Sequence, residues 1–478
     1  MSLASNPPIK FGTDGWRGII ADDFTFANVC KVTRAITAHL ERAYSAERPV
    51  LVGYDTRFLA DEFARMAAEV LAELGWSVRL VARDCPTPVM AHAAQDLGTA
   101  GALMFTASHN PPPYCGIKYI PDYAGPATTE ITNAIVDNIA GSAEDPPSGD
   151  GSARIARLEP QADYLQSLYA QFDCARIRSA RLSVKYDALY STSRGYMDRI
   201  LSECGCEVET FNAWRDVLFG GGMPEPKEAQ LRDLADAVRR DGADLGLATD
   251  GDGDRFGVMD ESGELLTPNT VLLLLAHHLV KNKGQTGAIV RTVATTHLLD
   301  RLASAYGLEA IETPVGFKYV GEQMRQRPVL IGGEESGGLS AIGHIPEKDG
   351  ILANMLVAEA MAYEGKPLSQ LVEEVLAEAG GPAYNQRLDL ELDDARKRAA
   401  MEHFHHNPPS ELAGIAVRET GHQDGVKLYL EEGSWVLLRP SGTEPLMRVY
   451  IESDTQAKQT QLAERVQAAL KQIEPVAA

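Results

Sequence analysis

Positive charge is scarce in this sequence. Its 478 residues carry 45 lysine and arginine residues against 67 aspartate and glutamate residues, which gives a formal net charge of −22. Nucleic acids and anionic membrane surfaces bind basic protein surfaces, so we expect neither of them as a partner. An anionic ligand would require the basic residues to converge locally in a cleft.

Cysteines and long apolar runs are also few. The longest apolar run is Val271–Val280, which is too short to cross a bilayer and is typical of a buried helix. No basic segment followed by an apolar segment opens the chain, so we expect no secretion signal. Of the six cysteines, only Cys204 and Cys206 lie close together, and no second Cys or His pair follows them. This spacing argues against a zinc site and predicts reduced thiols in a cytoplasmic protein.

A pattern of strand, helix, glycine and strand occurs three times along the chain. The copies begin at Pro49, Leu182 and Ala288. Each copy is typical of a βαβ crossover in a parallel sheet. From Tyr384 onward, short alternating strands and a closing helix indicate a smaller α+β domain. The sequence therefore predicts the α/β class, with three similar mixed-sheet α/β domains and a smaller C-terminal α+β domain.

Turn-rich segments indicate where these domains end. Gly141–Gly151 is rich in proline, glycine and serine, Asp250–Pro268 is rich in turns, and Gly380–Pro382 follows a predicted helix. A chain of this length fits about three or four domains. We expect domain I at residues 1–150, domain II at 151–258, domain III at 259–380 and domain IV at 381–478.

Each expected domain carries one polar loop directly after a strand, where parallel sheets gather ligands. In domain I, the loop Thr106–Pro113 follows the strand expected over Gly101–Phe105, and its three prolines favour a fixed loop. Ser108 lies at the end of that strand. A serine hydroxyl needs a neighbour that takes its proton, and His109 and Lys118 are the nearest candidates. The alternative is a proline-rich turn with an incidental serine. No G-x-S-x-G surrounds Ser108, so a hydrolase nucleophile elbow is not supported.

In domain II, the loop DGDGDR alternates three aspartates with two glycines. This spacing brings Asp250, Asp252 and Asp254 onto one side of a tight turn, where their mutual repulsion calls for a cation. Hard oxygen ligands suit Mg²⁺ or Ca²⁺. An EF-hand is excluded because Arg255 stands at the sixth position, where that loop requires glycine. The alternative is a solvated acidic turn.

The remaining loops carry groups that suit sugar and phosphate binding. Gly332–Gly338 combines two glutamates and a serine with glycines, which suits a polyhydroxyl ligand, an acid/base pair or a capped turn. Arg439–Pro445 combines an arginine, two hydroxyls and the N–H groups of a Ser-Gly-Thr turn. That set suits a phosphate clamp, or a plain turn with a surface arginine. The opening segment Phe11–Gly18 adds the cationic side chain of Arg17.

Taken together, these segments resemble the motifs of the α-D-phosphohexomutase family, which includes phosphoglucomutases, phosphomannomutases and phosphoglucosamine mutases. The matching pieces occur in the family's order and span nearly the whole chain. They are FGTDGWRG (11–18), TASHNPP (106–112), GIK (116–118), DGDGDR (250–255), GFK (316–318), GGEESGG (332–338) and RPSGTEP (439–445). The resemblance implies a four-domain, roughly heart-shaped molecule.

The resemblance also implies a role for each catalytic motif. Ser108 matches the serine that carries the transferable phosphoryl group, and Arg255 matches an arginine beside the metal. The implied Mg²⁺ ligands are Asp250, Asp252 and Asp254, together with an oxygen of phosphorylated Ser108.

Other residues match the family's substrate-binding positions. Glu334 and Ser336 match the residues that hold two sugar hydroxyls. The clamp for the phosphate that is not transferred matches Arg439, Ser441, Gly442 and Thr443. The basic residues around the reacting groups match Arg17, His109, Lys118 and Lys318. Among these, we assign the role of general base and acid to Lys118.

The enzyme implied by the resemblance is an intramolecular phosphotransferase that interconverts glucose 1-phosphate and glucose 6-phosphate. Mg²⁺ is its cofactor, and a hexose 1,6-bisphosphate is its intermediate and activator. Gly338 favours glucose, because phosphomannomutases and phosphoglucosamine mutases usually place a histidine there. The alternatives are a phosphomannomutase or dual-specificity enzyme, a hexose bisphosphate synthase, a metal-dependent phosphatase and, outside enzymes, a phosphosugar-binding protein. We expect a small-molecule phosphosugar as the ligand and a monomer or homodimer.

Overall fold

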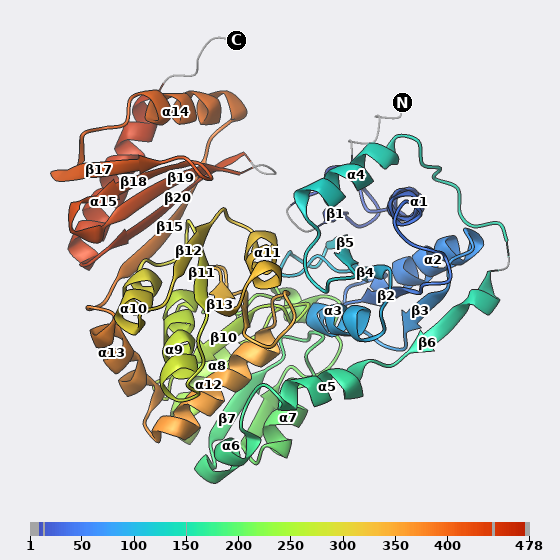
Figure 1. The fold of residues 1–478 in the computed structure, drawn as a ribbon, viewed down its shortest axis with the longest axis horizontal. Helices are drawn as coiled ribbons and strands as arrows, with labels where there is room; N and C mark the ends of the chain where they lie inside the picture. Colours follow the sequence, from blue (N-terminus) through green and yellow to red (C-terminus); the bar gives the residue numbers. More distant parts are fainter. Residues whose placement is uncertain (1–8, 13–14, 150, 442–444, 474–478) are drawn as a thin grey trace.

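A computed structural model describes residues 9–12, 15–149, 151–441 and 445–473 of the chain. The described residues form four sheets, which follow one another in chain order along an arc (Figure 1). The first and the last sheet lie at the two ends of this arc, and the second and third lie between them. The overall architecture confirms the prediction of three mixed α/β units followed by a different C-terminal unit.

The first sheet is mixed, because one strand, β5 (Tyr114–Pro121), pairs antiparallel with both of its neighbours, whereas the other pairings are parallel. Its spatial order is β1 (Trp16–Ile19), β5 (Tyr114–Pro121), β4 (Gly101–Phe105), β2 (Val50–Tyr54), β3 (Val78–Val81) and β6 (Ile155–Leu158). Its helices are α1 (Phe26–Leu40), α2 (Ala60–Glu73), α3 (Thr87–Asp96) and α4 (Thr129–Ile139). β6 comes after the Gly141–Gly151 linker, yet it pairs with β3 of this sheet.

The second and third sheets repeat the central arrangement of the first. The second sheet has the order β10 (Phe256–Met259), β9 (Leu245–Thr249), β7 (Ser183–Asp187) and β8 (Glu207–Phe211). The third has the order β14 (Leu339–Ala341), β13 (Val329–Gly333), β11 (Ala288–Thr292) and β12 (Ala310–Thr313). In all three sheets, three parallel strands are followed by one antiparallel strand that forms a hairpin with the third. The expected internal repeat is therefore confirmed.

Helices cover these sheets and close the core. Around the second sheet lie α5 (Gln161–Tyr169), α6 (Cys174–Ala180), α7 (Met197–Glu203) and α8 (Arg232–Asp241), with the short turn η2 (Phe219–Gly221), whereas the short turn η1 (Ser152–Arg154) packs against α2 of the first unit. Around the third lie α9 (Pro268–Lys281), α10 (Leu298–Tyr306), α11 (Phe317–Gln326), α12 (Gly350–Glu364) and α13 (Leu368–Glu378). The expected buried helix at Val271–Val280 lies within α9. None of the described helices is long and apolar enough to cross a membrane.

Helix α12 joins the second and third units into one core. Asp349 begins it, because its side chain accepts hydrogen bonds from the N–H groups of Ile351 and Leu352, and Gly365 ends it at a φ of 65°. Nearly every residue of α12 is buried, which explains why its sequence shows no polar face. It packs against α9 and against β9 and β10 of the second sheet. This helix therefore fixes the third unit against the metal loop, the segment Asp250–Arg255 between those two strands.

The fourth sheet is wholly antiparallel. Its order is β15 (Tyr384–Glu391), β20 (Leu446–Ser453), β19 (Trp435–Pro440), β18 (Val426–Leu430), β17 (Ile415–Gly421) and β16 (Glu411–Leu412). The helices α14 (Asp394–His406) and α15 (Gln456–Gln472) cover it, and the turn η3 (Glu431–Gly433) joins β18 to β19. The prediction of a smaller α+β unit is confirmed, whereas the residue-level domain boundaries stay predictions.

The expectation of reduced thiols is wrong for one pair of cysteines. Cys174 at the start of α6 and Cys204 at the end of α7 form a disulfide, with their Cα atoms 5.0 Å apart. That separation is within the range that a disulfide spans. The two residues are 30 positions apart in sequence, so only the packing of α6 beside α7 brings them together. Cys30, Cys85, Cys115 and Cys206 are free and buried.

Candidate active site

The first three polar loops occupy the same place in three repeated units. Each loop follows the third parallel strand of its sheet and leads into the antiparallel edge strand. The serine loop (Thr106–Pro113) lies between β4 and β5, and the metal loop lies between β9 and β10. The sugar loop (Glu334–Gly338) lies between β13 and β14. Since all three leave the carboxyl end of a parallel strand, the repeat itself directs them toward a shared site.

Ser108 lies against the metal loop. Its Oγ donates a hydrogen bond to Oδ2 of Asp250 at 3.0 Å and lies 3.3 Å from Nδ1 of His109. The backbone of Ser108 has a φ of 50°, in the left-handed region that residues other than glycine rarely adopt. Thr106 stabilises this conformation, because its Oγ1 accepts the Ser108 N–H at 2.8 Å. The structure therefore brings together the hydroxyl and the acidic loop that the sequence analysis placed in one site.

Arg57 holds the serine loop from behind, and the sequence analysis missed it. The side chain is fully buried and pairs through Nε with Oδ2 of Asp55 at 3.1 Å. Its terminal nitrogens donate to four backbone carbonyls of the loop, those of Ser108 at 2.6 Å, Asn110 at 2.6 Å, Pro111 at 2.9 Å and Tyr114 at 2.9 Å. A guanidinium with five donors suits such a template, and it fixes the unusual backbone at Ser108.

The three aspartates form a buried cluster whose oxygens converge. Asp250, Asp252 and Asp254 are each fully buried, and one oxygen from each lies within 4.8 Å of the others. Among the described residues, Oδ1 of Asp252 and Oδ1 of Asp254 have no hydrogen-bond partner. A buried carboxylate oxygen without a partner is costly, and a hard cation satisfies it. The cluster therefore fits a Mg²⁺ ion, which Asp250, Asp252 and Asp254 would hold.

Two lysines from different domains converge on the same aspartates. Lys118 of β5 lies 2.8 Å from Oδ2 of Asp252 and 3.1 Å from Oδ2 of Asp254, and Lys348 lies 2.9 Å from the latter oxygen. Burial would raise the pKa of Asp254, but Lys118 and Lys348 outweigh it and hold that pKa well below its ordinary value. Burial, together with the charges of Asp254 and Asp252, raises the pKa of Asp250 well above its ordinary value. The three carboxylates therefore repel one another, and a bound cation would reduce that repulsion.

Lys348 belongs to a segment, His344–Gly350, that no sequence motif indicated. Gly350 N donates to the Gly253 carbonyl of the metal loop at 3.0 Å. A Cβ added to Gly125 of domain I would meet the Pro346 carbonyl at 2.6 Å. The segment therefore lies where domains I, II and III meet, and its glycine contacts require close backbone approach.

The sugar loop lies next to the metal loop. Arg255 forms an isolated antiparallel bridge with Gly338, and the Arg255 N–H donates to Oδ1 of Asp250 at 3.0 Å. Glu334 is buried, and its Oε1 accepts the Gly316 N–H at 3.0 Å. Ser336 is half-buried on the same loop. Contacts thus connect the predicted sugar residues to the metal site through Arg255 and to the GFK segment through Glu334.

Of three further basic residues predicted from sequence, Arg17 and His109 contact the serine loop, and Lys318 contacts α4 of domain I. Nη1 of Arg17 donates to Oδ1 of Asn110 in the serine loop at 2.6 Å. Burial and the charges of Arg255 and Arg17 hold the pKa of His109 well below its ordinary value, so the imidazole is neutral near pH 7. Lys318 at the start of α11 donates to Oγ1 of Thr129 across the boundary with domain I at 3.0 Å.

The fourth loop is held within domain IV and lies beside domain III. Nε of Arg439 donates to Oδ2 of Asp424 at 2.8 Å, and Ser441 N donates to the Leu446 carbonyl at 2.9 Å. Gly442 and Thr443 of the predicted clamp lie outside the described residues. Lys397 of α14 supports the loop, because its Nζ donates to the Ser441 carbonyl at 3.1 Å.

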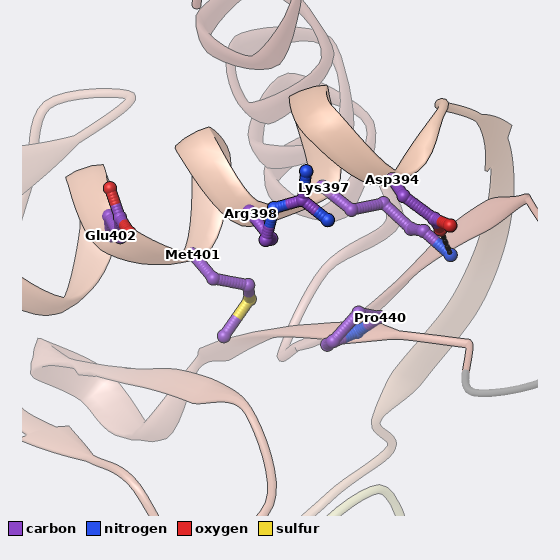
Figure 2. Close-up of a pocket in the computed structure, with 6 residues that line it drawn as sticks. All are labelled: Asp394, Lys397, Arg398, Met401, Glu402 and Pro440. Atoms are coloured by element: carbon purple, nitrogen blue, oxygen red, sulfur yellow. Dashed lines mark ion pairs between the residues drawn. The ribbon is translucent and has the colours of Figure 1, made fainter. Parts of the chain in front are cut away.

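A shallow pocket of about 300 Å³ lies beside this loop. Figure 2 shows Lys397, Arg398 and Met401 of α14 next to Pro440, with Lys397 paired to Asp394. Its lining mixes acidic, basic and apolar side chains. The pocket is therefore formed by α14 and the start of the fourth loop, and none of the three clustered aspartates lines it.

Ser108, the three aspartates and Glu334 thus come together from domains I, II and III, around a carboxylate cluster that could hold a metal ion. Four family models match the chain in order: the phosphoglucomutase/phosphomannomutase alpha/beta/alpha domain I at residues 8–145, domain II at 162–263, domain III at 267–379 and the C-terminal domain at 389–469. The chain therefore belongs to the phosphoglucomutase/phosphomannomutase family, within the α-D-phosphohexomutase superfamily of intramolecular phosphotransferases.

The names of individual relatives refer to different sugars. A protein of Methanothermobacter thermautotrophicus named "probable phosphoglucosamine mutase" is 32% identical over 474 residues, which cover 98% of this chain and 100% of that protein. A phosphoglucomutase/phosphomannomutase of Thermococcus kodakarensis is 30% identical, with 94% of this chain and 95% of that protein covered. A solved structure from Thermus thermophilus, provisionally named a phosphomannomutase, has 34% identity and a TM-score of 0.85, with 98% and 100% of the two chains covered.

Proposed function

We propose that this protein interconverts glucose 1-phosphate and glucose 6-phosphate through a phosphorylated Ser108 and a glucose 1,6-bisphosphate intermediate. One observation carries the proposal. The Ser108 hydroxyl lies 3.0 Å from Asp250, in a cluster of carboxylates of which two oxygens have no hydrogen-bond partner in the part of the chain that the structure describes. A phosphoryl group on Ser108 would therefore be next to the cation that such a cluster selects.

In the proposed reaction, a phosphoryl group passes twice between Ser108 and the sugar. The bond between Oγ of Ser108 and phosphorus breaks, and a bond to a sugar hydroxyl oxygen forms. Lys118 donates a proton to the Oγ that the phosphoryl group leaves and takes the proton of the attacking sugar hydroxyl in its place. When the other phosphoryl group comes back to Oγ, Lys118 takes the Oγ proton and donates one to the sugar oxygen that is released. Bound Mg²⁺ supplies positive charge that neutralises the transferring group. Burial of Ser108 and the aspartates excludes water, which would otherwise hydrolyse the phosphoserine.

The remaining predicted residues bind and orient the sugar phosphate in this proposal. Glu334 and Ser336 accept and donate hydrogen bonds to sugar hydroxyls, and Arg439 with its loop binds the phosphate that is not transferred. Because both isomers present a phosphate to the same clamp, the bisphosphate must turn around in the site before the second transfer. Arg17 adds positive charge at the serine loop, and Lys318 is assigned to the same phosphosugar from its match to the family motif.

The contact between Gly338 and Lys348 supports glucose as the sugar. A Cβ on residue 338 would lie 2.3 Å from Cδ and 2.8 Å from Cγ of Lys348. The lysine stem therefore fills the space that a histidine at position 338 would need. Its ammonium lies 2.9 Å from Oδ2 of Asp254, so the space beside residue 338 holds the stem of a cation that contacts the aspartate cluster. Mannose and glucosamine stay as alternative sugars, because relatives named for these two sugars are 34% and 32% identical to this chain.

A comparison of three substrates tests the sugar assignment. The purified protein is assayed with glucose 1-phosphate, mannose 1-phosphate and glucosamine 1-phosphate, each with Mg²⁺ and a trace of the matching bisphosphate. We expect kcat/KM for glucose 1-phosphate to exceed the others by about tenfold, which corresponds to one hydrogen bond of discrimination. Faster turnover of either other sugar would reassign the substrate, and release of inorganic phosphate without isomer exchange would indicate a phosphatase.

A double-mutant cycle tests the role of Lys348. We expect Lys348→Ala to lower kcat by about 100-fold, since removal of one donor to developing charge costs that much. Gly338→Ala should cost about tenfold, because its methyl group displaces the lysine stem from Asp254. In a Lys348→Ala background the clash is gone, so Gly338→Ala should add nothing further. Additive effects in steady-state kinetics would contradict the shared-space argument.

A further inference from the structure

The segment Val315–Lys318, which leads into the first turn of α11, links domains I, III and IV through hydrogen bonds. Val315 N donates to Oδ2 of Asp424 in domain IV at 3.0 Å. Gly316 N donates to Oε1 of Glu334 in the sugar loop at 3.0 Å. Lys318 donates to a threonine of α4 in domain I at 3.0 Å. Any movement of this segment therefore changes the sugar loop and the contact with domain IV together.

Asp424 connects this segment to the phosphate clamp. The same Oδ2 that accepts the Val315 N–H also accepts Nε of Arg439 at 2.8 Å. About three quarters of the Asp424 side chain and four fifths of the Arg439 side chain are buried, with exposures of 25% and 19%. The adjacent Gly425 has a φ of 101°, and a Cβ on it would meet the Leu438 carbonyl at 2.3 Å. The turn that carries Asp424 is therefore pressed against β19, directly before Arg439.

The interface beneath Asp424 is closely packed. Lys427, at the start of β18, is 2% exposed. Its Nζ donates to the Val293 carbonyl at 2.6 Å and lies 2.8 Å from Nε2 of His297 and 3.0 Å from Oε2 of Glu312. One buried apolar cluster joins the two domains here, and its members are Val293, Ala294, Trp435, Leu437 and Tyr450. The Lys427 ammonium lies over the Trp435 ring, 4.3 Å from its centroid. Domain IV is thus fixed on domain III by a buried interface, and Asp424 lies at the edge of that interface, next to Arg439.

We propose that Asp424 is a positioning residue, which presets Arg439 for the substrate phosphate and couples the phosphate clamp to the sugar loop. This inference rests on the proposed function, because it takes Arg439 as the phosphate ligand. Asp424 engages Nε of Arg439, and the two terminal nitrogens are a pair that can bind a phosphate bidentately. A long side chain that is already oriented loses less conformational freedom when the phosphate binds.

The coupling to the sugar loop follows from the shared oxygen. Oδ2 of Asp424 accepts hydrogen bonds from Arg439 and from the Val315 N–H. The next residue, Gly316, donates its N–H to Glu334, so two backbone hydrogen bonds connect Asp424 to the sugar loop. The clamp must hold the phosphate of either isomer while Glu334 faces a different set of hydroxyls. A carboxylate that fixes both groups keeps their separation constant for the two binding modes.

Two substitutions separate the two bonds of Asp424. Asp424→Asn keeps an oxygen that accepts the Val315 N–H but removes the charge that orients Arg439. Asp424→Ala removes both bonds. Asp454→Asn is the matched control, because Asp454 also lies in domain IV and pairs with a basic residue, Lys458, on the surface at 3.0 Å. Each protein is assayed with both glucose phosphates, and its Kd for inorganic phosphate is measured by calorimetry with Mg²⁺ present.

We expect Asp424→Asn to raise KM for both isomers and Kd for inorganic phosphate by about tenfold, with kcat changed less than about twofold. Asp424→Ala should raise KM further and also lower the preference for glucose over mannose by about threefold or more, because the sugar loop loses its tie. Asp454→Asn should match the wild type. An unchanged KM and Kd in both variants, or a loss of kcat at constant KM, would overturn the inference. If the wild type itself fails to interconvert sugar phosphates, the proposed function fails, and the phosphate-binding measurement still decides the role of Asp424.

Discussion

Replacing Ser108 with alanine should lower turnover of glucose 1-phosphate by at least about 10⁴-fold, because the atom that carries the phosphoryl group is removed. The substitution deletes only Oγ and its 3.0 Å hydrogen bond to Asp250. The loss of that bond is worth about 1 kcal/mol of stability, so the protein should remain folded. Steady-state assays measure the loss of turnover. Intact-mass analysis after incubation with glucose 1,6-bisphosphate shows whether a phosphoryl group is still taken up.

Ser434→Ala is the matched control for this experiment. Ser434 is buried like Ser108, and its hydroxyl is also in a 3.0 Å hydrogen bond, with Ser453 in domain IV. It should keep full activity and should accept phosphate at Ser108. A Ser108→Ala protein that turns over glucose 1-phosphate at the wild-type rate would exclude a phosphoserine mechanism. A Ser434→Ala protein that is equally inactive would show that the loss comes from folding.

The site residues that sequence reasoning could predict are those that follow one another in the chain. Asp250, Asp252 and Asp254 alternate with glycines within a single turn, so their convergence is a local property of the backbone. The residues of the serine loop are also consecutive in the chain, and its prolines predict a fixed backbone conformation. What the sequence could not show is how closely the two loops meet, because the 3.0 Å contact between Ser108 and Asp250 spans 142 residues.

The residues that were missed act over long distances and belong to no polar cluster. Arg57 is a single arginine after a strand, and its role depends on four carbonyls of a loop about 50 residues away. Lys348 lies between an isoleucine-proline pair and a helix cap, and only the meeting of three domains brings it to Asp254. A buried arginine cannot be told from an exposed one by sequence pattern, since burial depends on the tertiary structure.

The fold was more predictable than the pairing of its strands. The three copies of strand, helix and strand follow from hydrophobic periodicity and glycine stops, and the sheet orders confirm them. The pairing of β6 with β3 was not visible, because a linker rich in proline and glycine separates them and such a linker normally ends a domain. The Cys174–Cys204 disulfide was not visible either, because it depends on two helices packing side by side.

Asp252→Asn should abolish the response of the protein to Mg²⁺ and lower turnover by about 10³-fold or more. The amide keeps the size of the carboxylate and can still accept hydrogen bonds from Lys118 and Thr87, which contact Oδ2 at 2.8 Å and 2.6 Å. It removes the negative charge whose second oxygen, Oδ1, has no partner among the described residues. Metal affinity should therefore fall much more than the stability of the metal-free protein.

Thermal unfolding with and without Mg²⁺ measures this difference. A ligand present at about 100 times its Kd stabilises a protein by about 2.7 kcal/mol, so the wild type should show a clear rise in Tm that EDTA reverses. Asp252→Asn should show no rise. Asp260→Asn is the control, because Asp260 is also buried and accepts N–H groups of Ser262 and Glu264 just beyond β10. It should lose some stability but keep the Mg²⁺ response, since its carboxylate caps a turn. A full Mg²⁺ response in Asp252→Asn would place the cation elsewhere and separate Ser108 from the metal.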